Sequence, residues 1–216
     1  MIKVEKIDVW GFEHAIRGMR NPMNSWELSD TIYDYKHPWC WGSPSNEITA
    51  CIGENDLKLM KSLSKAGSEH RKYLRQIFIS MDITAPLYWW KEADQYRISV
   101  TTNSCSTMHT IDKKEFELDD FSHEHLIDSV MAVLYGTVCT LNQCRKKFLE
   151  TKDKEYWWQM IQLLPSSYNQ KRTLTMSYEN AVNMIHQRKA HKLDEWREFV
   201  GILMELPYMK EILNED

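Results

Sequence analysis

Glycine is scarce in this sequence, with only seven among 216 residues. The turn that binds a dinucleotide needs the pattern Gly-x-Gly-x-x-Gly, and a P-loop needs Gly-x-x-x-x-Gly-Lys followed by serine or threonine. Neither pattern occurs, and the Gly-x-Ser-x-Gly elbow of the α/β-hydrolases is also missing. These absences disfavour a Rossmann domain, a P-loop nucleotidase and a hydrolase built on that elbow.

Long apolar runs, strong charge and paired cysteines are absent as well. The first six residues lack the apolar stretch of a signal peptide, and no later segment is long and apolar enough to cross a bilayer. The formal net charge of -4 gives no reason to expect binding to DNA, RNA or a membrane. The five cysteines are an odd number, so we expect free thiols and a cytoplasmic protein. The spacings His123-x-His125 and Cys139-x4-Cys144 do not fit a zinc site, and we expect no metal.

The composition that remains is that of a globular protein. Hydrophobic residues make up 43% and charged residues 27%, which argues against disorder, and the length fits one domain over residues 1–216. Nine tryptophans and ten tyrosines are many for this length, and we expect most of them in the core. Residues 29–54 break any period and predict a loop insertion. In it, Trp39 or Trp41 is either the apolar face of a lid or tucked under the loop.

Hydrophobic periodicity predicts an alternation of strands and helices that ends in several helices. The expected strands cover residues 2–9, 73–79, 98–102 and 172–176, with one break in the alternation of the first strand and a turn at 82–86. The expected helices cover residues 12–20, 55–66, 88–91, 122–148, 155–164, 177–188 and 193–203. Asn55, Ser122 and Ser177 are expected as N-caps. This order predicts an α/β (α+β) fold with a central β-sheet flanked by helices.

Two tryptophans and a lysine stand at consecutive positions of the short expected helix. Trp89, Trp90 and Lys91 point in three directions about 100° apart. Either one ring stacks on a planar ligand while the lysine reaches a phosphate, or both rings fill the core and the lysine is surface. The residue types alone leave both interpretations open.

Three further positions carry candidate polar groups. In the expected strand Ser99 faces away from its apolar neighbours, which puts its hydroxyl on the polar or pocket side. Arg188 lies close to the apolar face of its helix and needs a partner, which is either a salt bridge or an anionic or carbonyl-bearing ligand. Arg17 and Arg20 form a small basic cluster that is either solvated surface or a phosphate contact.

The order of several short motifs resembles the flavin-dependent thymidylate synthases. That family carries Glu-His, then a helix with Arg-His-Arg, then seven residues and a serine. Here Glu69-His70, Trp89-Trp90-Lys91 and, after seven residues, Ser99 fall in the same places. The C-terminal pattern of the family follows in order at Leu164-Pro165, Thr175, Asn183, Arg188 and Trp196. The resemblance covers about residues 55–205 and, weakly, the first strand and helix; residues 29–54 are outside it.

The resemblance implies a fold, a reaction and a set of site residues. The fold is the family's α/β fold, assembled as a homotetramer with FAD at the subunit interfaces. The reaction is the reductive methylation of dUMP to dTMP, in which methylenetetrahydrofolate supplies the carbon, NADPH reduces the flavin and no protein nucleophile is used. The matching residues are Arg188 and Ser99 at the nucleotide and His70, Lys91, Asn183, Trp89 and Trp90 at the cofactor.

The sequence departs from the family at several anchoring positions. Trp89 and Trp90 stand where the family has arginine and histidine, and Ser177-x-Glu179 stands where it has Asn-x-Arg. The second change reverses a charge that the resemblance implies to face a cofactor phosphate. Two other functions therefore stay open: a different modification of a pyrimidine nucleotide, or a binding protein on the same fold without turnover.

Overall fold

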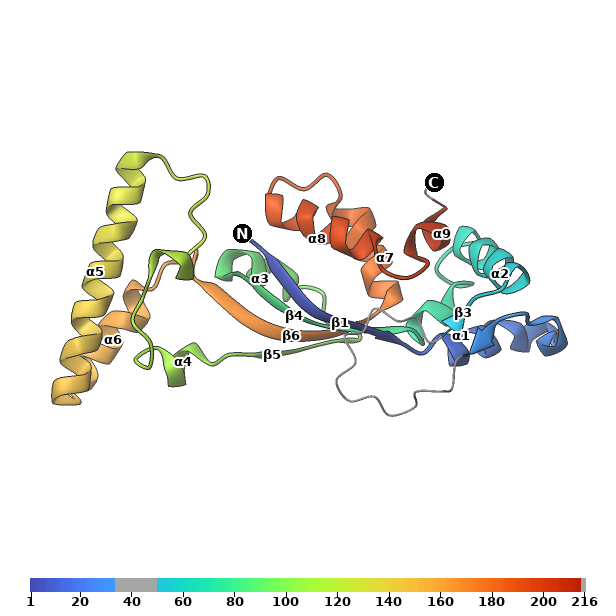
Figure 1. Cartoon of the computed structure of the whole chain (residues 1–216), viewed down its shortest axis with the longest axis horizontal. Helices are drawn as coiled ribbons and strands as arrows, with labels where there is room; N and C mark the ends of the chain where they lie inside the picture. The colour runs from blue at the N-terminus through green and yellow to red at the C-terminus, as the bar shows by residue number, and fades with distance from the viewer. Residues whose placement is uncertain (34–49, 215–216) are drawn as a thin grey trace. The chain divides into compact units, whose positions relative to one another are not determined.

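A four-stranded sheet organises the chain. The structure, a computed structural model, describes residues 1–33 and 50–214, so the interpretation of Trp39 and Trp41 lies outside the described residues. The strands lie in the order β1-β4-β6-β5 (Figure 1). Their bounds are β1 (Lys3–Trp10), β4 (Phe78–Pro86), β5 (Val100–Ser104) and β6 (Asn169–Ser177), with a separate short pair of β2 (Ile32–Tyr33) and β3 (Ala50–Cys51). The helices are α1 (Phe12–Arg20), α2 (Glu54–Lys65), α3 (Leu87–Ala93), α4 (Thr107–Thr110), α5 (Asp128–Thr151), α6 (Lys154–Leu163), α7 (Tyr178–Arg188), α8 (Asp194–Met204) and α9 (Met209–Leu213). The predicted α/β (α+β) fold with a central sheet flanked by helices is confirmed.

The chain divides into two compact units, which are described separately below. The first unit consists of Met1–Lys3, Ile83–Gln95 and Asn103–Arg172. The second consists of Val4–Asp82, Tyr96–Thr102 and Thr173–Asp216. The expectation of one domain over residues 1–216 stays a prediction.

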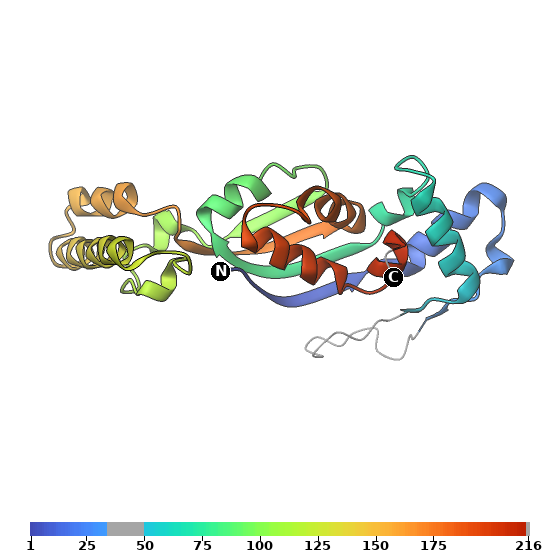
Figure 2. The same cartoon turned by 90° about the horizontal axis from the view of Figure 1, so that it is seen from above.

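The first unit is built on two helices that pack along each other, α5 and α6 (Figure 2). Its buried cluster consists of Ile111, Phe116, Phe121, Leu134, Val138, Leu141 and Met160. The prediction that Ser122 caps the long helix is wrong, because α5 begins only at Asp128. The hydroxyl of Ser122 instead donates to Asn169 Oδ1 at 2.8 Å and accepts from the amine of Met1 at 2.9 Å.

Strand β4 corrects two predictions. Residues 73–79 were expected as a strand, but Lys72–Arg75 is a 3₁₀ turn, and the strand begins at Phe78 and continues to Pro86 without a turn at 82–86. From Phe78 to Ala85 its odd-numbered residues are buried, while its even-numbered ones are half-buried on the other face; Pro86 at its end is buried. Asp82 is therefore a residue of this half-exposed face, where its Oδ1 accepts from Thr173 Oγ1 at 2.7 Å. A polar alternation inside a strand was mistaken for a turn signal.

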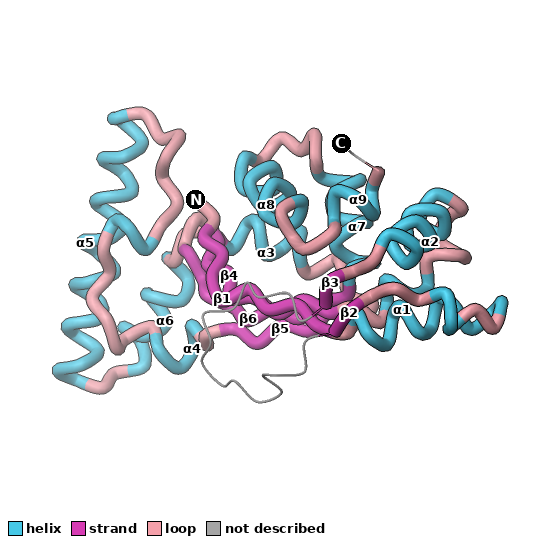
Figure 3. The backbone as a smooth tube through the Cα atoms, turned by 45° about the vertical axis from the view of Figure 1, so that its right-hand side comes forward, coloured by secondary structure: helices cyan, strands magenta, loops and turns pink. Residues whose placement is uncertain are grey.

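In the second unit, α7 packs against α8 and α2 against α9 (Figure 3). The helix α2 begins at Glu54 with Gly53 at the N-cap position, so Asn55 is not the cap. Asp30 supplies the missing acceptor from a distant segment: its two carboxylate oxygens accept from the backbone N–H of Asn55 at 2.9 Å and of Asp56 at 3.1 Å. Because these N–H groups have no partner within the helix, a carboxylate there does the work of a cap.

Three smaller features complete the fold. Lys6 has a φ of 51°, at the point where the alternation of the first strand was expected to break. The described ends of the 29–54 segment are the antiparallel pair β2–β3, in which Ile32 pairs with Cys51. Within residues 1–33 and 50–214, no helix combines the length and the hydropathy needed to span a bilayer.

Candidate functional site

The helix α7 carries two of the predicted site residues, Asn183 and Arg188. The Ser177 side chain accepts from the Asn180 N–H at 3.4 Å, which confirms the predicted cap. One side of the helix is buried through Tyr178, Ala181, Val182, Met184 and Ile185. Glu179 and Asn183 are four residues apart and therefore share a face. The helix thus fixes a polar row while its apolar side packs in the unit.

Arg71 connects this polar row to the Glu69-His70 motif. Its Nη2 donates to Glu179 Oε1 at 3.0 Å and to Asn183 Oδ1 at 3.1 Å, and its Nε lies 2.9 Å from Glu179 Oε2. Glu179 is buried, and a buried carboxylate needs a paired cation. The reversed charge at position 179 is therefore balanced inside the chain. Sequence reasoning missed Arg71, although a glutamate on a largely apolar helix was a signal that some cation had to meet it.

Arg188 ends α7 and lies against two aromatic rings. Its Nε donates to the hydroxyl of Tyr96 at 2.9 Å. The centre of its guanidinium lies 4.7 Å from the ring of Trp196 and 5.5 Å from the ring of Tyr96. The sequence predicted that Arg188 needs a partner, and the structure gives it a hydroxyl and two aromatic rings, which were not among the partners considered. They are within the range of a cation–π interaction, which holds an arginine without neutralising its charge.

Ser99 lies beside α7, but not in a strand as predicted. Its φ of 58° is in the left-handed region, and β5 begins only at Val100. The chain therefore turns at Ser99, and the argument from strand alternation does not apply to its side chain. The carbonyl of Ser99 accepts from Asn180 Nδ2 at 3.2 Å, and the residue is exposed. A role at a nucleotide stays a prediction.

His70 is exposed and lies in the turn that follows α2. Its backbone N–H donates to the carbonyl of Gly67 at 3.0 Å, which fixes the turn. It directly precedes Arg71, so it is one residue away from the contacts with Glu179 and Asn183. The second unit thus gathers four predicted residues around α7: Asn183 and Arg188 on the helix, Ser99 through Asn180, and His70 through Arg71.

The remaining predicted residues belong to α3 in the first unit. Trp89 and Trp90 are both 0% exposed, and their rings meet edge to face at 4.8 Å. Trp90 Nε1 donates to the carbonyl of Gln170 at 2.9 Å, and the guanidinium of Arg172 lies 4.3 Å from its ring. The structure therefore favours the interpretation of both tryptophans as core. Lys91 is exposed, and the assignment of these three residues to a cofactor stays a prediction.

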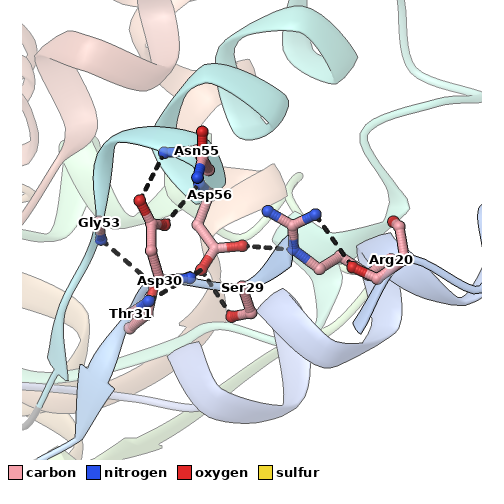
Figure 4. Close-up of polar contacts among 8 residues, drawn as sticks. Arg20, Ser29, Asp30, Thr31, Gly53, Asn55 and Asp56 are labelled. Atoms are coloured by element: carbon pink, nitrogen blue, oxygen red, sulfur yellow. Dashed lines mark hydrogen bonds and ion pairs between the residues drawn. The ribbon is translucent and has the colours of Figure 1, made fainter. Parts of the chain in front are cut away.

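The basic pair Arg17 and Arg20 separates into two unrelated side chains. Arg17 is exposed, whereas Arg20 is buried and its Nε donates to Asp56 Oδ1 at 2.6 Å (Figure 4). The second oxygen of Asp56 accepts from the hydroxyl of Ser29 at 2.7 Å and from that of Thr31 at 2.6 Å. Both interpretations of the pair are thus wrong for Arg20, because its charge is used in a buried ion pair.

Fold and site together define a mixed α/β protein whose helix α7 presents an asparagine, a paired glutamate and a terminal arginine. No sequence profile of a known family matches the chain, and no curated protein sequence matches it. Two solved structures share its fold, both of thymidylate synthase ThyX from Helicobacter pylori with FAD and dUMP. One has a TM-score of 0.68 and 18% identity over 100% of this chain and 98% of its own. The other, described as flavin-dependent, has a TM-score of 0.66 and 18% identity over 98% of this chain and 99% of its own. The chain therefore has the fold of those enzymes, as its motifs predicted.

Proposed function

We propose that this protein is a flavin-dependent, thymidylate-synthase-like enzyme that methylates dUMP reductively to dTMP. Methylenetetrahydrofolate is the proposed carbon donor, FAD the cofactor and NADPH its reductant. One observation carries the proposal: this chain shares its fold over the full length with a synthase crystallised with FAD and dUMP. In this chain, motif residues from distant segments lie around α7.

The side chains near the polar row of α7 fit the proposed cofactor. FAD offers an anionic diphosphate and a ring edge of carbonyl and N–H groups, which amide, imidazole and guanidinium groups can bind. Asn183 and Arg71 supply an amide and a guanidinium 3.1 Å apart, with the exposed His70 next in sequence. We propose that His70 and Asn183 hold FAD; the assignment of Lys91, Trp89 and Trp90 to the cofactor stays a separate prediction. When bound and reduced, FAD supplies the hydride.

We assign Arg188 and Ser99 to the nucleotide. Arg188 is a fixed cation that suits a phosphate or a carbonyl oxygen, and Ser99 adds a hydroxyl from an exposed turn. Neither side chain acts as a nucleophile in this proposal. Their work is to bind and orient dUMP and to stabilise charge during the reaction, which are electrostatic and positional contributions.

A second function has specific support from two departures. The buried rings of Trp89 and Trp90 stand in place of the arginine and the histidine of the family motif. Glu179 stands in place of a family arginine, and its ion pair with Arg71 leaves that pair without net charge. Each lost charge-assisted hydrogen bond costs about 1.5–3 kcal/mol of binding. A relative that binds a pyrimidine nucleotide without this turnover, or with another modification of it, accounts for both departures.

The proposed assembly is a homotetramer in the cytoplasm. Support comes from α5, where Val130 is 44% and Val133 is 68% exposed on a side that carries apolar residues. Apolar residues spaced three apart on an exposed helix face favour contact with another subunit.

Visible absorbance of the purified protein tests the proposal. Oxidised-flavin bands that remain with the protein, and that change on addition of dUMP, are the expected result. Turnover of dUMP in the presence of methylenetetrahydrofolate, NADPH and FAD separates the synthase from the second function. A colourless protein that takes up no added FAD, yet binds dUMP, would exclude the synthase and favour the nucleotide-binding relative.

A further inference from the structure

We propose that Tyr96 is a positioning residue for Arg188, and that its hydroxyl holds the guanidinium in the pose that binds a nucleotide. The inference deepens the proposed function and rests on its assignment of Arg188 to the nucleotide. Tyr96 belongs to none of the motifs from which that function was inferred, and it lies 92 residues before Arg188 in the chain.

The hydrogen bonds of Tyr96 have a defined direction. Arg188 Nε–H can only donate, so Tyr96 Oη accepts at 2.9 Å. The same hydroxyl donates its proton to Gln187 Oε1, also at 2.9 Å. A chain of two hydrogen bonds therefore runs from Arg188 through Tyr96 to Gln187. It needs a side chain that can both accept and donate, as the phenol of tyrosine does. Phenylalanine keeps the ring and loses both bonds.

The buried ring of Trp196 supports the Arg188 guanidinium from one side. Its ring is 0% exposed and is packed by Phe199 at 6.1 Å and by His191 at 6.2 Å, both nearly edge-on. The Arg188 guanidinium lies 4.7 Å from the centre of that ring, within the range of a cation–π contact. Such a contact holds the cation near the ring, whereas the hydrogen bond from Nε to Tyr96 also fixes its orientation.

The loop that carries Tyr96 is also attached at its other end. Ser99 accepts from Asn180 near the start of α7, and Tyr96 bonds to Gln187 and Arg188 at its end. The short segment 96–99 thus runs along α7 and is fixed at two points. A free arginine side chain loses rotamer entropy when it is fixed on binding. A side chain that is already ordered loses less of it when a nucleotide arrives.

The test compares Tyr96→Phe with Tyr208→Phe in the full chain. Tyr208 is matched: its hydroxyl also accepts one bond, from the N–H of Ile52 at 3.0 Å, and donates one, to the carbonyl of Ala50 at 3.4 Å. It belongs to the same unit and is half-buried like Tyr96. Two quantities are measured: the NMR signal of the Arg188 Nε–H group in ligand-free protein, and the dissociation constant of dUMP by calorimetry.

Tyr96→Phe is expected to shift the Arg188 Nε–H signal and speed its exchange with water, and to weaken dUMP binding about tenfold. Tyr208→Phe is expected to change neither. If the wild-type protein binds dUMP, two results in Tyr96→Phe overturn the positioning role. One is an unchanged Arg188 Nε–H signal, and the other is a changed signal with an unchanged affinity for dUMP. A wild-type protein that binds no dUMP instead overturns the proposed function, and the positioning role for a nucleotide with it.

Discussion

At the scale of single residues, Asp56 gives the clearest prediction. Burial raises the pKa of its carboxyl group, but hydrogen bonds from Thr31, Ser29 and Arg20 and the charge of Arg20 outweigh it, so the pKa is lowered. The contribution of Asp56 to stability is therefore present above the ordinary aspartate pKa of about 3.9, and it is lost as the pH falls through the lower folded value. Asp56→Asn is expected to lower the free energy of unfolding by about 3 kcal/mol at neutral pH, because Arg20 stays buried without its anion.

Urea denaturation at neutral pH and at about pH 3 measures this difference and its loss in acid. The matched control is Asp128→Asn, an exposed aspartate in the first turn of α5, for which less than about 0.5 kcal/mol is expected. Equal urea midpoints for wild type and Asp56→Asn at neutral pH would show that the ion pair contributes nothing.

The sequence indicated that Arg188 needs a partner, but it did not indicate which residues that partner would be. Arg188 was expected to need one, and it contacts Tyr96 and Trp196, to which no spacing rule links it. Arg20 and Asp56 lie 36 residues apart, and a local pattern gives no information at that distance. Contacts of this kind depend on tertiary packing.

At the scale of elements, α3 carries the departure from the family motif. Trp89→Arg restores an arginine at the first motif position, yet that position is 0% exposed. The change removes a large ring from the core, which costs about 3–5 kcal/mol, and buries a cation as well. We therefore expect it to lower the midpoint of thermal unfolding strongly and to gain no flavin binding.

Lys91→Arg is the matched control on the same helix. It restores the last motif arginine at an exposed position and is expected to change stability by less than about 0.5 kcal/mol. A Trp89→Arg protein that unfolds at the wild-type temperature and binds FAD more tightly would contradict the interpretation of Trp89 as core.

Most helix bounds were predicted well, but the start of α5 and the bounds of β4 and β5 were not. The bounds of α1 agree with the expected helix 12–20, and α6, α7 and α8 lie within a residue or so of their expected ranges. Ser99 was placed in a strand because its neighbours are β-branched, although its left-handed φ makes it a turn residue. Local propensity cannot show where a strand begins, and here the residue before β5 is held by a tertiary contact, the bond from Asn180.

At the scale of the whole molecule, the order of motifs predicted the fold where no periodicity could have done so. Period and propensity give only strands and helices with a sheet. The spacing from Trp89 through Ser99 to Arg188 pointed to one particular arrangement, and two solved structures with 18% identity share it. The site was only partly predictable, because Arg71, Glu179 and Tyr96 acquire their roles through contacts between distant segments.

The helix α5 makes the proposed homotetramer testable. Leu134, Val138 and Leu141 of this helix are buried, whereas Val130 and Val133 are exposed. Val133→Glu is expected to leave the fold intact, since Val133 is 68% exposed, and to lower the molar mass measured by light scattering. Lys146→Glu also introduces a glutamate, but at a position about 140° around the helix from Val133, and it is expected to leave the molar mass unchanged. A tetramer that survives Val133→Glu at micromolar concentration would exclude this side of α5 from the interface, and a monomeric wild type would exclude the tetramer itself.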